Sequence, residues 1–135
     1  MELKVIRNFI EAINSADIDR IYYLMTDDHV FVDTQGNQTI GNENMKKAWA
    51  GYFELFPDYK IEITETLHND SIIVILGYAG GTYKPAIRNA DNKNHWRVPA
   101  AWKAMVADGK IKFWQVYADN IPALEIINLN KADSK

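Results

Sequence analysis

Three aspartates in this sequence occupy places where a carboxyl group could act as a general base. Asp33 directly follows the apolar residues Phe31 and Val32, Asp119 follows an aromatic stretch, and Asp58 follows a proline. Apolar and aromatic neighbours strip water from a carboxyl group, which raises its pKa and suits it to proton abstraction near neutral pH. Acids at strand ends also accept hydrogen bonds from the backbone N–H groups of turns. We therefore take Asp33 and Asp119 as candidate catalytic residues, with the turn-forming role open for both, and Asp58 as a turn residue.

Other reactive side chains form no recognisable motif. The chain has no cysteine, which excludes disulfides, thiolate catalysis and thiolate metal sites. No serine lies in the G-x-S-x-G pattern of a nucleophile elbow. The histidines, His29, His68 and His95, lack the close spacings that are typical of zinc sites. We expect no metal and no organic cofactor.

Large aromatic residues come from several separate segments of the chain. They fill cores, and where a curved sheet lies under helices they also wall ligand cavities. Trp96 and Trp102 share one predicted strand at even spacing, so both side chains should face the same side. The sequence therefore predicts one pocket for a small apolar ligand.

Length and composition predict one globular domain over residues 1–135. Apolar residues make up 47% of the chain and charged residues 24%, which argues against disorder. A net charge of −3 and the absence of a Lys/Arg run argue against nucleic-acid binding. No apolar run is long enough to span a membrane, and the charged N-terminal segment does not resemble a signal peptide. We expect no membrane partner and a cytoplasmic location.

Hydrophobic periodicity predicts helices first and long strands later. Helical spacing and capping residues predict three helices and a short closing one, over 3–14, 17–24, 41–56 and 122–129. Alternation and turn residues predict strands over 29–33, 59–69, 71–83, 95–107 and 110–119, with turns at 35–38, 69–70 and 108–109. The polar segment 84–94 reads as the tip of a hairpin. This order favours the α+β class, with helices packed on a strongly curved, mainly antiparallel sheet that closes around the pocket.

The chain resembles the nuclear transport factor 2-like superfamily, in particular its SnoaL-like and ketosteroid-isomerase-like members. The resemblance rests on the order of the segments 9–17, 24–28 and 30–33, Gly41, the pair 57–58, and the final hairpin 108–114 followed by Tyr117 and Asp119. It covers nearly the whole chain. It implies a cone of curved sheet, a cystatin-like roll, with the three N-terminal helices on its concave face. Pairing into a homodimer through the sheet is also implied.

The resemblance says less about the reaction. Asp33 matches the general base of ketosteroid isomerases, and Asp119 matches the acid/base position of SnoaL-like polyketide cyclases. The oxyanion donors of the isomerases fall at Phe9 and Ala101, whose side chains cannot donate a hydrogen bond. The Arg/Asp pair of epoxide hydrolases of this fold is absent, because Arg97 is followed two residues later by a proline.

Three hypotheses follow from the residues and the resemblance. The first is a cofactor-independent isomerase or cyclase that uses an Asp general base on an apolar carbonyl compound. The second is a non-catalytic module for ligand binding or dimerisation, and the third is a protein that binds partners through the outer face of the sheet. The expected substrate-binding residues are Phe9, Phe31, Trp49, Phe53, Tyr78, Ala101, Trp102 and Trp114. Strict alternation places Trp114 and Asp119 on opposite faces of the last strand, so Asp119 reaches the pocket only through a bulge or at the twisted strand end.

Overall fold

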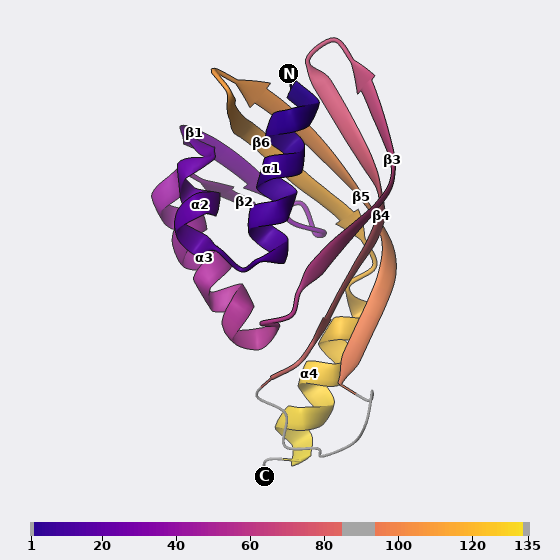
Figure 1. The fold of residues 1–135 in the computed structure, drawn as a ribbon. Helices are drawn as coiled ribbons and strands as arrows, with labels where there is room; N and C mark the ends of the chain where they lie inside the picture. Colours follow the sequence, from indigo (N-terminus) through magenta and orange to yellow (C-terminus); the bar gives the residue numbers. More distant parts are fainter. Residues whose placement is uncertain (1, 85–93, 134–135) are drawn as a thin grey trace.

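The first three helices of this protein lie on one side of a curved sheet, and the last one lies at its end (Figure 1). The computed structural model describes residues 2–84 and 94–133. The helices are α1 (Glu2–Asn14), α2 (Ile18–Tyr23), α3 (Asn42–Leu55) and α4 (Ile121–Asp133). The strands are β1 (Met25–Val32), β2 (Gln38–Ile40), β3 (Lys60–Asn69), β4 (Ile72–Thr82), β5 (His95–Ala107) and β6 (Lys110–Ala118).

The six strands form one sheet in the order β2-β1-β6-β5-β4-β3. Every neighbouring pair is antiparallel except β1 and β6, which run parallel. The helices α1 to α3 lie on the concave side, and α4 lies at one end of the sheet (Figure 1). The predicted α+β class with a mainly antiparallel curved sheet is confirmed. The sheet does not close on itself, because β2 and β3 remain as edges.

Local signals placed the helices well. The apolar stripe of α1 buries Ile6, Phe9 and Ile13 against the sheet. The Asp17 carboxylate accepts a hydrogen bond from the Arg20 N–H and so caps α2. The helix α4 continues to Asp133, four residues beyond the predicted closing helix, and the predicted hairpin tip lies largely outside the described residues.

The strand β2 was not predicted from the sequence. It pairs with the end of β1 across the turn that follows Asp33, with Val32 opposite Gln38 and Val30 opposite Ile40. The strand β1 itself begins at Met25, four residues before the predicted start. Both differences come from polar residues that pair in the sheet without an apolar alternation to mark them.

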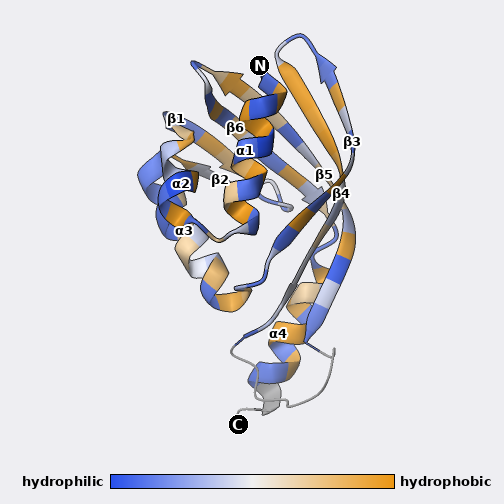
Figure 2. Ribbon diagram, viewed as in Figure 1, coloured by the Kyte–Doolittle hydropathy of each residue, from blue (hydrophilic) through white to orange (hydrophobic). Residues whose placement is uncertain are grey.

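Apolar side chains of the central strands meet those of the helices in one core. Buried positions alternate with more exposed ones along β4 and β5, although the first part of β4, from Ile72 to Leu76, is apolar throughout (Figure 2). Ile73 and Ile75 of β4 and Trp102 and Ala104 of β5 are almost fully buried. Each large apolar side chain buried in this way stabilises the fold by about 1.5–3 kcal/mol relative to exposure.

One polar side chain, His29, is completely buried in this core. Its Nδ1 lies 2.8 Å from the carbonyl oxygen of Ile111, and its ring lies 6.4 Å from that of Phe9. Burial lowers the pKa of His29 below its ordinary value, and the hydrogen bond to Ile111 only partly offsets the effect. The imidazole is therefore neutral in the folded protein and donates from Nδ1.

The curvature of the sheet depends on a close approach between β3 and β4. The pairing of these strands shifts register between Ile63 and Glu65, opposite Gly77. A β-carbon on Gly77 would overlap the carbonyl oxygen of Glu62. Only glycine fits here, so the bulge and the bend depend on this position.

The substitution Gly77→Ala should lower the free energy of unfolding by about 1–3 kcal/mol, because the methyl group forces the two backbones apart. Urea denaturation followed by circular dichroism measures the change. The matched control is Gly51→Ala in α3, where a β-carbon meets nothing within 4 Å and replaces glycine inside a helix. That variant should be more stable by about 0.5–1 kcal/mol. Equal effects of the two substitutions would show that Gly77 does not limit the packing of β3 on β4.

Acid should destabilise the protein through His29. The unfolded histidine has a pKa of about 6.5, and the folded one has a lower pKa, so the unfolded chain binds more protons as the pH falls. The His29 contribution is fully present above the unfolded pKa and is lost as the pH falls below it. The free energy of unfolding, measured from pH 7.5 to 5.5, should fall more steeply for the wild type than for His29→Asn. Parallel pH profiles of the two proteins would disprove this role.

Candidate functional site

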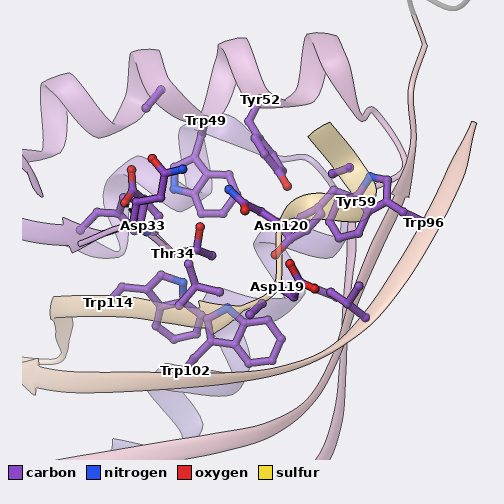
Figure 3. A pocket seen from close by; sticks show the side chains of 18 of the residues that line it. Asp33, Thr34, Trp49, Tyr52, Tyr59, Trp96, Trp102, Trp114, Asp119 and Asn120 are labelled. Carbon is purple, nitrogen blue, oxygen red and sulfur yellow. Dashed lines mark hydrogen bonds between the residues drawn. The ribbon is translucent and has the colours of Figure 1, made fainter. Parts of the chain in front are cut away.

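A cavity of about 300 Å³ lies between α3, the concave face of the sheet and the start of α4 (Figure 3). This is at the small end of the size range of ligand pockets. The lining residues are Phe31, Asp33, Thr34, Gln35, Met45, Ala48, Trp49, Tyr52, Tyr59, Ala79, Trp96, Val98, Trp102, Trp114, Val116, Ala118, Asp119, Asn120 and Ala123. The hollow is therefore walled mainly by aromatic rings and small apolar side chains, with polar groups at a few points.

The aromatic walls of the cavity form two groups. In the first, the Tyr59 ring packs against Tyr52, Trp49 and Trp96, with ring centroids 5.0, 6.3 and 6.2 Å away. In the second, Trp102 and Trp114 stack with centroids 6.4 Å apart and planes inclined by 28°. Figure 3 shows the two groups on different sides of the space. Such mutual packing holds the rings in place, so the walls are largely preformed.

Both candidate carboxylates line this cavity, and both also hold a turn. Asp33 Oδ1 accepts hydrogen bonds of 2.9 Å from the backbone N–H groups of Gln35 and Asn37. Asp119 Oδ1 accepts one of 3.0 Å from the Ile121 N–H at the start of α4. Asp33 is half-buried, whereas Asp119 is exposed. Each carboxylate therefore has the turn-forming role that the sequence left open, and each also borders the cavity.

Two tyrosines add hydroxyl groups to the wall. Burial raises the pKa of Tyr52 well above its ordinary value and raises that of Tyr59 as well. Both phenols therefore keep their protons and are hydrogen-bond donors. Neither hydroxyl has a hydrogen-bond partner among the described residues. A ligand with an acceptor atom would find two neutral donors here.

The indole N–H groups of Trp49 and Trp96 are buried and have no partner within the described ranges. A buried donor without a partner destabilises a protein by about 1–3 kcal/mol. Unpaired groups of this kind are uncommon in protein interiors. Two of the four among the described residues belong to the cavity wall, and the other two are Thr26 Oγ1 and His29 Nε2.

Most of the predicted binding residues reach the cavity or its supporting layer. Phe31, Trp49, Trp102 and Trp114 line it, as does Trp96, which faces the same way as Trp102. Two others lie behind the wall. Phe9 packs edge-on against Trp114 with centroids 5.0 Å apart, and Phe53 stacks on Trp49 at 5.5 Å.

Two predicted residues lie elsewhere. Tyr78 and Ala101 project from the opposite, convex face, because the buried positions of β4 are the odd-numbered residues and those of β5 the even-numbered ones. The Tyr78 ring lies 3.8 Å from the Arg97 guanidinium. Neither Tyr78 nor Ala101 lines the cavity, and the prediction that they bind substrate there is corrected.

The conflict between Trp114 and Asp119 resolves at the end of β6. The strand ends at Ala118, and Asp119 belongs to the connection into α4. Trp114, Val116 and Ala118 alternate toward the cavity, and the chain then turns so that Asp119 also lines it. The strand end, and not a bulge, brings this carboxylate to the site.

Several lining residues were not assigned to the site from the sequence. Tyr52 lies one helical turn after Trp49, so the helical period held a signal for it. Tyr59 begins the predicted strand 59–69 and shares a face with Ile61, so the period of two held a signal for it. Asn120 follows the end of β6, where the path of the chain cannot be read from periodicity. Asp58 behaves as the predicted turn residue, since its carboxylate accepts hydrogen bonds from the N–H and hydroxyl of Thr82. These bonds hold the pKa of Asp58 below its ordinary value although burial acts in the other direction.

No group of three or more His, Asp or Glu side chains within the described ranges is placed to hold a metal ion. No helix in the same ranges has both the length and the apolar character needed to cross a bilayer.

Comparison with known structures identifies many similar folds. A protein with a ketosteroid isomerase-like fold from Catenulispora acidiphila, solved with trimethylamine, has a TM-score of 0.77 at 19% identity, over 90% of this chain and 89% of that one. A candidate SnoaL-like polyketide cyclase from Jannaschia gives 0.76 at 16%, over 96% and 91%. An LEH-like epoxide hydrolase from M. tuberculosis gives 0.74 at 13%, over 96% and 90%. Identities this low establish the fold alone.

A comparison with curated protein sequences gives no match. The family model described as "SnoaL-like domain" matches residues 6–114, most of the chain. The match spans α1 to the middle of β6 and so includes most of the cavity wall. The chain belongs to the SnoaL-like domain family.

Proposed function

We propose that this protein is a cofactor-independent enzyme that moves a proton next to the carbonyl group of a small, mainly apolar molecule. One observation carries the proposal: a carboxylate and two protonated phenols line a single apolar cavity. Carboxylates take protons from carbon, and neutral donors stabilise the oxygen charge that develops as they do so. The names of similar structures, a candidate polyketide cyclase and an epoxide hydrolase, are consistent with a small organic substrate.

Asp33 is the favoured general base. The two turn hydrogen bonds go to Oδ1, and no described residue donates to Oδ2. The turn thus fixes the carboxylate while one oxygen stays free for a substrate C–H. Abstraction would place the proton on Asp33 and the electron pair in an enolate, and return of that proton to another carbon would complete an isomerisation. Asp119 is the less suited base because it is exposed and thus better hydrated.

Tyr52 and Tyr59 would donate to the enolate oxygen. Their hydroxyls would donate the hydrogen bonds that the side chains of Phe9 and Ala101 cannot. A single well-placed donor to an oxyanion contributes about 10²–10³-fold to a rate. Because burial keeps both phenols protonated, they would remain donors throughout the neutral pH range.

Replacement of Asp33 by Asn should remove most of this activity, because the amide fills the same space and can still accept the turn hydrogen bonds. With 3-cyclohexen-1-one as the probe, conversion to the conjugated ketone is followed by its ultraviolet absorbance. We expect Asp33→Asn to lower the rate by about 10²- to 10⁴-fold. The matched control is Asp28→Asn, an exposed carboxylate of β1 outside the cavity, which should keep the wild-type rate. Unchanged turnover in Asp33→Asn would remove Asp33 from the mechanism, and the same substitution at Asp119 then tests the other acid.

A second candidate function is non-catalytic ligand binding in the same cavity. The observation that favours it is that both carboxylates already serve turns. In that case the ketone would bind without turnover, and Asp33→Asn would leave its dissociation constant nearly unchanged.

We also propose that two copies pair through the convex face of the sheet, as the family resemblance implies. An exposed aromatic side chain on that face supports this, that of Tyr117, which is 51% exposed. Tyr117→Glu should convert a dimer to a monomer in light scattering, because a charge at an apolar contact disfavours association. Tyr23→Glu is the control, since Tyr23 is also exposed but lies on α2. A dimer that survives Tyr117→Glu and dissociates with Tyr23→Glu would place the contact elsewhere.

A further inference from the structure

The charge of the cavity has one sign only. Asp33 and Asp119 are the charged residues that line it, and no Lys, Arg or His of the described ranges does so. Neither carboxylate forms an ion pair within the described part of the chain. The apolar wall strengthens the field most at Asp33, which is half-buried, whereas water screens more of the charge of the exposed Asp119. An anionic ligand would therefore be repelled, and a cationic one attracted.

The rings of the cavity offer a second attraction for a cation. Trp102 and Trp114 form one wall, and the group around Tyr59 forms the other (Figure 3). The faces of such rings are electronegative and bind cations, tryptophan most strongly. Every protein cation found over a ring in the described residues lies over an aromatic that does not line the cavity: Tyr22, Tyr23, Tyr78 or Phe113. Within the described ranges, no protein cation therefore lies over a ring of the cavity.

Two unlike observations, uncompensated negative charge and an aromatic enclosure, therefore favour the same ligand chemistry. We infer that the cavity selects a small organic ammonium compound whose nitrogen carries alkyl groups. Alkyl groups suit this wall because a primary ammonium has three N–H donors to satisfy, and most of the wall is apolar. The cavity volume of 300 Å³ equals the volume that about ten water molecules occupy in the liquid. The ligand is therefore compact.

The inference deepens the proposed function and rests on it for one point, that this cavity is the functional site. Under that proposal the ammonium group and the reacting carbonyl belong to one molecule. The aromatic walls would hold the ammonium, while the Asp33 carboxylate and the tyrosine hydroxyls would face the carbonyl. Charge selection and proton transfer are separable, because a ligand without a carbonyl can still test the first.

Two probes of nearly equal shape isolate the charge. Choline carries a trimethylammonium group, and 3,3-dimethyl-1-butanol carries a neutral tert-butyl group in its place. Isothermal titration calorimetry at low ionic strength should show choline binding at least about tenfold more tightly, as expected for a cation held by several rings. Equal affinities, or tighter binding of the neutral alcohol, would overturn the inference.

Variants then test whether the cation lies in this cavity. Asp119→Asn can keep the hydrogen bond that starts α4, yet it should weaken choline binding about two- to fivefold, as for an exposed ion pair. Tyr52→Leu should weaken choline binding about threefold or more and leave the binding of the neutral alcohol nearly unchanged. Tyr78→Leu is the matched control, a tyrosine of the convex face whose loss should change neither affinity. Thermal denaturation verifies that each variant is folded. Equal losses in Tyr52→Leu and Tyr78→Leu, or none in Asp119→Asn and Tyr52→Leu, would place choline outside the cavity.

The two proposals fail in distinguishable ways. If choline binds selectively but no ketone is turned over, the ammonium preference stands and the catalytic proposal falls. If Asp33-dependent turnover is found while choline and its neutral analogue bind alike, the catalytic proposal stands and the inference on charge falls.

Discussion

Side-chain alternation along the bent strands decides which groups can reach the cavity. On β5 the even-numbered residues face the helices, and Trp96, Val98 and Trp102 line the hollow as a consequence. This pattern is effective only because the sheet curves away from α3 enough to leave space. The curvature in turn needs the close backbone approach at Gly77, which no side chain would permit. Aromatic and apolar side chains form the wall of the cavity, and the bend of the sheet leaves the space that they enclose.

Local patterns predicted the architecture because most of its elements carry local signals. A few neighbouring residues are enough to predict three of these features: the apolar stripe of α1, the cap at Asp17 and the Asp108-Gly109 turn. The strand β2 carries no such signal, since its three residues pair with β1 without an apolar face of their own. The strand β2 forms by pairing with β1, and its own residues carry no local pattern that predicts this pairing.

The cavity lining was predicted less completely than the fold, because sequence reasoning placed some strand residues on the wrong face of the sheet. Ala101 was assigned by family position, although it is adjacent to Trp102 and strict alternation cannot place both side chains on one face. Tyr78 lies between two buried positions of β4 and faces the convex side for the same reason. Asn120 could not be placed, because it follows the end of a regular element. Asp33 and Asp119 were candidates from the sequence, but their double position as turn acceptors and cavity-lining groups needed coordinates.

The four tryptophans of the chain are Trp49, Trp96, Trp102 and Trp114, and all of them border the same hollow. The intrinsic tryptophan fluorescence of this protein therefore reports on the environment of this one cavity. Quenching or a spectral shift on adding a compound would reflect occupancy of the cavity, with no background from indoles at remote sites. The molecule thus contains its own optical probe, which makes a label-free screen of compound libraries practicable.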